Sequence, residues 1–159
     1  MKQWFHHEDL GLLQPEVPKD AAIAAHSRYD HQISVFGAEF QAKLAKQKWF
    51  LIGAGALGCE YLKGFAMMGI GTSKEGEVRV TDMDTVDVSN LSRQFLFHRE
   101  NVGHPKSTAA AEAVRKMNPE INIKVFQTAV EPKTEDTFDD AFWEGINGVC
   151  NGIFVEANE

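Results

Sequence analysis

Three glycines that follow an apolar run constrain the fold of this chain more than any other feature. Gly53, Gly55 and Gly58 come directly after the apolar residues 49–52 and open an amphipathic stretch. The pattern predicts a buried strand, a tight turn and a helix whose first N–H groups can face a phosphate. Tight turns also need glycine for purely structural reasons, so the spacing alone is only a weak indication of a ligand.

Hydrophobic residues along the rest of the chain switch between the period of a strand and the spacing of a helix. The predicted strands are 48–52, 77–81, 121–126 and 146–155, and the predicted helices are 33–46, 56–68, 105–117 and 138–143. Strands and helices that alternate in this way form a parallel sheet with helices on its faces. We therefore predict an α/β, Rossmann-like fold with a mostly parallel sheet and helices on both faces.

Two of the predicted helices carry apolar positions that we expect to face the core. In the helix after the glycine turn, these positions are Leu57, Tyr61, Leu62 and Phe65. In the helix at 33–46, which we expect to pack on the sheet, they are Val35, Phe36, Phe40 and Leu44. Between the second strand and the third helix, residues 84–103 form a long connection, which usually signals function or short helical turns.

Composition narrows the class of protein. The 159 residues suit one domain, and 43% hydrophobic content is enough for a core. A net charge of -7 argues against binding to nucleic acid. The most apolar stretch contains Glu60 and Lys63 and several glycines, so we expect no membrane partner. Two cysteines, Cys59 and Cys150, give no disulfide framework, and we expect a soluble protein in a reducing compartment.

Asp82 is the first candidate for a polar contact with a nucleotide. It ends the second predicted strand, 24 residues after Gly58. A carboxylate about 20 residues after such a turn typically accepts hydrogen bonds from ribose hydroxyls. The alternative interpretation is an aspartate that caps a helix or loop.

Two cations distinguish nucleotidyl transfer from hydride transfer. Arg93 and Lys106 can stabilise the negative charge that builds at the α-phosphate and on departing pyrophosphate. Lys106 lies in the first turn of a predicted helix, where a cation opposes the helix dipole unless an anion is near; the alternative is a solvated lysine. Asn90 and Gln94 can orient a phosphate or carboxylate around Arg93, or they hold the loop in shape.

Other polar residues are assigned no chemistry. Asp84 and Asp87 are more simply exposed turn acids than metal ligands. The six histidines show no metal-ligand spacing, and we predict no metal site made by this chain. Cys59 is expected to be a small buried residue and not a nucleophile.

Five motifs in this order resemble the active adenylation domain of eukaryotic ubiquitin-activating enzymes. That domain belongs to a superfamily of adenylating enzymes shared with bacterial molybdopterin and thiamine biosynthesis proteins. The motifs are residues 28–32, 53–60, 81–85, 89–97 and 106–111.

The resemblance implies that the chain takes part in ATP-dependent adenylation of the C-terminus of ubiquitin or a ubiquitin-like modifier. Arg93 and Lys106 would contact the phosphates as catalytic residues, and Asp82 would bind the ribose. The other nucleotide-binding residues would be Gly53, Gly55, Ala56, Gly58, Asn90 and Gln94. Its cofactors would be ATP and Mg2+, its partners the modifier and an inactive adenylation half, and its location the cytoplasm and nucleus.

The sequence departs from this family after Asn151. The family continues with Ala-Leu-Asp-Asn, whose aspartate helps to hold magnesium, whereas this chain reads Gly-Ile-Phe-Val from Gly152. We therefore expect a truncated domain: residues 1–27 as the tail of a preceding domain, 28–151 as an incomplete adenylation domain, and 152–159 as a divergent tail. Such a fragment would bind ATP weakly and be inactive alone. Two alternatives stay open, a fragment of an NAD-binding dehydrogenase and a non-catalytic remnant.

Overall fold

The sheet of this protein is parallel throughout. The computed structural model describes residues 18–23 and 25–153. Its four described strands are β1 (Lys48–Ile52), β2 (Glu77–Thr81), β3 (Ile123–Phe126) and β4 (Gly148–Asn151). They lie side by side in the order β3-β2-β1-β4, and every neighbouring pair is parallel. This order confirms the predicted Rossmann-like α/β fold.

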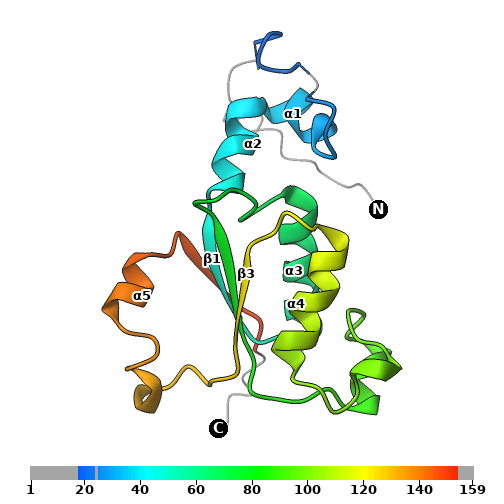
Figure 1. Cartoon of the computed structure of the whole chain (residues 1–159), viewed down its shortest axis with the longest axis vertical. Helices are drawn as coiled ribbons and strands as arrows, with labels where there is room; N and C mark the ends of the chain where they lie inside the picture. Colours follow the sequence, from blue (N-terminus) through cyan, green and yellow to red (C-terminus); the bar gives the residue numbers. More distant parts are fainter. Residues whose placement is uncertain (1–17, 24, 154–159) are drawn as a thin grey trace, which may run out of the picture. The chain divides into compact units, whose positions relative to one another are not determined.

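Helices cover both faces of the sheet, as predicted. Helices α3 (Ala56–Met68) and α4 (Lys106–Met117) lie together on one face, and α5 (Asp140–Glu144) lies on the other (Figure 1). On the α5 face, the buried Phe50 ring packs against the rings of Phe142 and Trp143, with centroids 5.0 and 5.7 Å away. The short 3-10 turn η4 (Pro132–Thr134) precedes α5.

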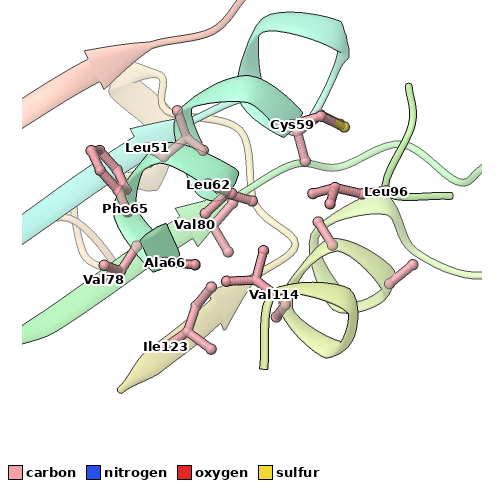
Figure 2. Close-up of a cluster of buried hydrophobic side chains, with 14 of the residues drawn as sticks. Leu51, Cys59, Leu62, Phe65, Ala66, Val78, Val80, Leu96, Val114 and Ile123 are labelled. Atoms are coloured by element: carbon pink, nitrogen blue, oxygen red, sulfur yellow. The ribbon is translucent and has the colours of Figure 1, made fainter. Parts of the chain in front are cut away.

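The main core lies between the sheet and the pair α3 and α4. Strand residues alternate between the two faces, so residues next to Phe50 point the opposite way, toward the helices. Figure 2 shows the resulting cluster, in which strand and helix side chains converge. Its labelled members are Leu51, Cys59, Leu62, Phe65, Ala66, Val78, Val80, Leu96, Val114 and Ile123.

Of the four α3 residues predicted to face the core, two are buried and two are exposed. Leu62 and Phe65 are buried, but Leu57 and Tyr61 are 52% and 40% exposed. The buried face instead runs through Gly58, Cys59, Leu62, Phe65 and Ala66. A Cβ on Gly58 would lie 2.1 Å from the Gly53 carbonyl oxygen, so this glycine must face the strand. The contact rotates the helix and turns Leu57 and Tyr61 outward.

The prediction of one continuous helix at 33–46 is wrong. The segment forms two helices, α1 (Asp30–Phe36) and α2 (Ala38–Ala45), separated by Gly37. Gly37 has φ of 85° and ψ of 157°, an extended positive-φ conformation open to glycine that ends α1, and its N–H donates to the Ile33 carbonyl. Three of the four apolar side chains predicted to be buried there are exposed: Val35, Phe36 and Phe40.

The chain divides into two compact units, Met1–Gln41 and Ala42–Glu159. All predicted site residues belong to the second unit.

The long connection after β2 contains two 3-10 turns, η2 (Val88–Ser92) and η3 (Arg99–Asn101), which confirms the expected helical turns. Within the described residues, no helix combines the length and apolarity needed to cross a bilayer. Most of the predicted tails, 1–17 and 154–159, lies outside the described residues.

Two glycines of α3 provide a matched test of the contact between α3 and β1. Gly58→Ala is expected to lower the free energy of unfolding by about 2 kcal/mol or more, because the new methyl group would collide with backbone. Gly64→Ala places its Cβ 3.8 Å from Met68, an ordinary contact. That control is expected to raise the free energy by about 0.5–1 kcal/mol, since alanine favours a helix. Urea unfolding measures both, and equal effects at the two positions would contradict the assigned contact.

Candidate functional site

The glycine turn joins β1 to α3 at the carboxyl end of the sheet. Gly53 has φ of 92°, a conformation that favours glycine, and its N–H donates to the Thr81 carbonyl over 2.8 Å. Gly55 is the N-cap of α3 and brings no side chain to cap the helix. Ala56 follows as the first helical residue. The first N–H groups of α3 have no partner within the helix, and such a terminus favours an anion.

Asp82 connects the glycine turn to the end of β2. Its Oδ2 accepts the Ala54 N–H over 2.7 Å, and its Oδ1 accepts the Asp84 N–H over 2.8 Å. The loop-capping role that the sequence left open is therefore present. A carboxylate has about four acceptor positions, so these two bonds leave capacity for ribose hydroxyls. Ribose binding by Asp82 stays a prediction.

The η2 turn is held by its own side chains. Asp87 caps it by accepting the Ser89 N–H over 2.7 Å, and Asn90 Oδ1 accepts the Asp87 N–H over 2.9 Å. The Ser89 N–H bond lowers the pKa of the exposed Asp87 carboxyl below its ordinary value. Asn90 is buried. It thus holds the loop in shape, the simpler of the two roles weighed for it.

Gln94 lies against the glycine turn. Its Nε2 is 4.0 Å from the position that a Cβ on Gly55 would occupy. The residue is only 4% exposed, and its Oε1 has no hydrogen-bond partner among the described residues. A buried, unpaired acceptor is costly, so this oxygen is suited to receive a donor from a ligand. No local pattern in the sequence placed Gln94 beside Gly55, although the resemblance assigned both to the nucleotide site.

The segment that carries Gln94 is anchored on α3. Leu96 and Cys59 lie in the same buried cluster (Figure 2), and Lys63 Nζ lies 5.1 Å from the centroid of the Phe95 ring. These contacts bring residues 89–97 next to the first turns of α3. Arg93, in contrast, is exposed, and its Nη1 donates to the Ser89 carbonyl over 3.1 Å. The convergence of Arg93 and Lys106 on one phosphate chain stays a prediction.

Lys106 is not a solvated lysine. Its side chain is 11% exposed, and its Nζ lies 2.8 Å from Asp84 Oδ2. Its backbone N–H donates to the Asp84 carbonyl over 2.9 Å. Asp84, read from the sequence as a turn acid, is therefore the missed partner of Lys106. A short antiparallel bridge between Thr85 and Pro105 brings the two together, and no local pattern in the sequence predicts it.

No metal site emerges within the described part of the chain. Among the described residues, no three His, Cys, Asp or Glu side chains lie close enough together to hold a metal ion. The side chains of residues 18–23 and 25–153 therefore form no magnesium site. A hollow of about 490 Å³ lies between α4 and the loops before it, lined among others by Phe95, His98, His104, Glu112 and Lys116. None of the predicted site residues lines this hollow.

The cysteines are unsuited to nucleophilic attack. Burial raises the pKa of the Cys59 thiol to about 11, and the thiol lies 3.9 Å from the Ala54 carbonyl oxygen. Burial also raises the pKa of Cys150. Both thiols are protonated near neutral pH, and the thiolate is the reactive form. This agrees with the expectation that Cys59 is a small buried residue.

Sequence comparison identifies the family. The ThiF family model matches residues 29–153. The chain is 48% identical over 154 residues to ubiquitin-like modifier-activating enzyme 1 of Mus musculus, and 52% identical over 153 residues to ubiquitin-activating enzyme E1 2 of Triticum aestivum. Each match covers 95% of this chain but only 15% and 14% of the relative. The chain belongs to the ThiF family, and the resemblance to ubiquitin-activating enzymes is confirmed.

Two solved structures from E. coli share the fold. The tRNA N6-threonylcarbamoyladenosine dehydratase of E. coli, in a crystal structure with ATP, superposes with a TM-score of 0.70 and 27% identity. The match covers 80% of this chain and 49% of that one. E. coli MccB gives a TM-score of 0.60 and 28% identity, covering 69% of this chain and 32% of MccB. The chain spans about half or less of each of these proteins.

Because burial raises the pKa of the Cys59 thiol, we expect the protein to lose stability at high pH. The unfolded thiol ionises near 9.0, whereas the folded one ionises only near 11. The stabilisation is therefore complete below pH 9 and is lost as the pH rises toward 11, by about 3 kcal/mol in total. Urea unfolding at pH 8 and pH 10.5 should show a larger loss for the wild type than for Cys59→Ala. Equal losses in the two proteins would show that this thiol is not buried as described.

Proposed function

We propose that this chain binds ATP and supplies the nucleotide-binding site for adenylation of a ubiquitin-like modifier. The identity of about 48% to ubiquitin-activating enzymes over 95% of the chain carries the proposal. Three features of the site support it: the N-terminus of α3, which no side chain of its N-cap residue caps, the Asp82 carboxylate that binds the glycine turn, and the buried ammonium of Lys106. The crystal structure of the E. coli dehydratase with ATP, a protein that shares this fold, supports ATP as the nucleotide.

The proposed reaction joins the C-terminal carboxylate of the modifier to AMP. A carboxylate oxygen attacks the α-phosphorus of ATP, the bond from that phosphorus to the bridging oxygen breaks, and pyrophosphate leaves with the electron pair. Lys106 and Arg93 would stabilise the charge that moves onto the phosphate oxygens. The N–H groups at the start of α3 and the unpaired Gln94 Oε1 would orient the nucleotide.

The reaction to which this chain contributes would end at the acyl adenylate. Transfer to a thioester needs a reactive thiolate, and both cysteines of the chain, Cys59 and Cys150, have raised pKa values. The catalytic cysteine would come from another domain. We likewise assign an inactive adenylation half as the structural partner, and the cytoplasm and nucleus as the location, on the resemblance to ubiquitin-activating enzymes.

ATP binding tests the roles of the two cations. Arg93→Ala and Lys106→Ala are each expected to weaken ATP binding about tenfold or more, because each loses a hydrogen bond between a charged group and phosphate. Arg99→Ala, which removes an exposed arginine from η3, is the matched control and should bind ATP as the wild type does. Isothermal titration calorimetry on the 159-residue chain measures the dissociation constants.

Two outcomes would overturn the proposed function. Binding of NAD in preference to ATP would favour the dehydrogenase interpretation. Cooperative unfolding without any effect of ATP on the wild type would favour a non-catalytic protein. Exchange of labelled pyrophosphate into ATP, stimulated by ubiquitin in the presence of the remaining domains of a relative, then tests the adenylation step itself.

A further inference from the structure

The Lys106 ammonium occupies an unfavourable place for a cation. Its side chain is 11% exposed, so the ammonium has lost most of its water. It also belongs to the first residue of α4, where the helix dipole disfavours positive charge. An ammonium in such a position needs an anionic partner, and the structure supplies Asp84 at 2.8 Å.

Asp84 holds Lys106 at two points. Its side-chain oxygen accepts a hydrogen from Nζ, and its backbone carbonyl accepts the Lys106 N–H over 2.9 Å. The Asp84 side chain itself is 61% exposed. The carboxylate thus keeps much of its own water while it compensates the desolvated ammonium and fixes where Nζ lies.

A continuous set of hydrogen bonds connects this pair to the glycine turn. The Ala54 N–H donates to Asp82 Oδ2, the Asp84 N–H donates to Asp82 Oδ1, and Lys106 Nζ donates to Asp84 Oδ2. The Ser107 hydroxyl also donates to the Asp82 carbonyl over 3.4 Å. The start of α4 is thereby tied to the same strand end that carries the predicted ribose acceptor.

We propose that Asp84 is a positioning residue that fixes the Lys106 ammonium for contact with the phosphates of the bound nucleotide. The inference rests on the proposed function and adds a residue to it. An ammonium has three donor hydrogens, and the bond to Asp84 uses one of them. The other two are available to phosphate oxygens while the first keeps Nζ at the end of β2. Asp84 thus acts through Lys106 and does not itself contact the nucleotide.

A double-mutant cycle on nucleotide binding tests the role. Asp84→Ala is expected to weaken ATP binding about fivefold, and Asp84→Asn, which keeps an acceptor oxygen, to weaken it less. Binding of adenosine, which has no phosphate, should be unchanged in both variants. In a Lys106→Ala background, Asp84→Ala should produce no further loss of ATP affinity. Asp136→Ala removes one negative charge from an exposed residue and is the control for general electrostatics.

Each contrary outcome has a distinct meaning. An equal loss of adenosine binding would show that Asp84 only shapes the loop. A loss of the same size in the Lys106→Ala background, or tighter ATP binding by Asp84→Ala, would show that it does not position the lysine. These results overturn the positioning role while the wild type still binds ATP. If the wild type does not bind ATP, the proposed function fails, and the positioning role fails with it.

Discussion

The close approach of helix α3 to the end of strand β1 is the contact on which the rest of this structure depends. Gly58 lies so near the Gly53 carbonyl that a Cβ would overlap it. The contact sets the rotation of α3, and the rotation decides that Cys59, Leu62 and Ala66 face the sheet. The same contact lets the first N–H groups of the helix emerge at the carboxyl end of the sheet, where parallel α/β folds bind their ligands.

Two acids at the end of β2 serve this edge of the sheet in different ways. Asp82 turns toward the glycine turn and binds backbone N–H groups of Ala54, after β1, and Asp84, after β2. Asp84 turns toward α4 and binds the ammonium of Lys106. Through Ala54 and Lys106, these two acids join the glycine turn after β1, the end of β2 and the start of α4. The site is therefore a property of the sheet edge and not of any one motif.

The sequence was sufficient for the features that depend on local geometry. The strand at 48–52 follows from its apolar run. Helix α3 ends at Gly69, which has a left-handed conformation, and helix α4 starts after Pro105. Each of these signals acts within a few residues. The inner face of α3 was half wrong because Leu57 and Tyr61 fit the helical period as well as the truly buried residues do. Gly37 was overlooked because a single glycine inside an apolar pattern does not by itself end a helix.

The candidate site was predictable in its residue types but not in its pairings. Glycine spacing and an aspartate at a strand end point to Gly53 and Asp82 without any knowledge of the fold. The Asp84 to Lys106 contact depends on 22 residues of chain returning to the same strand end, which no local rule describes. The placement of Gln94 beside Gly55 likewise depends on how the 89–97 segment packs on α3.

The net charge of -7 makes the local arrangement of charge decisive for a polyanionic ligand. Long-range attraction does not draw ATP to such a chain, so binding must rely on donors fixed at short range. A buried lysine without a partner would be costly. The Asp84 carboxylate compensates the Lys106 ammonium and holds it in place, and two of the ammonium hydrogens remain for a phosphate. Hydride transfer has no use for such a cation, whereas departure of pyrophosphate does.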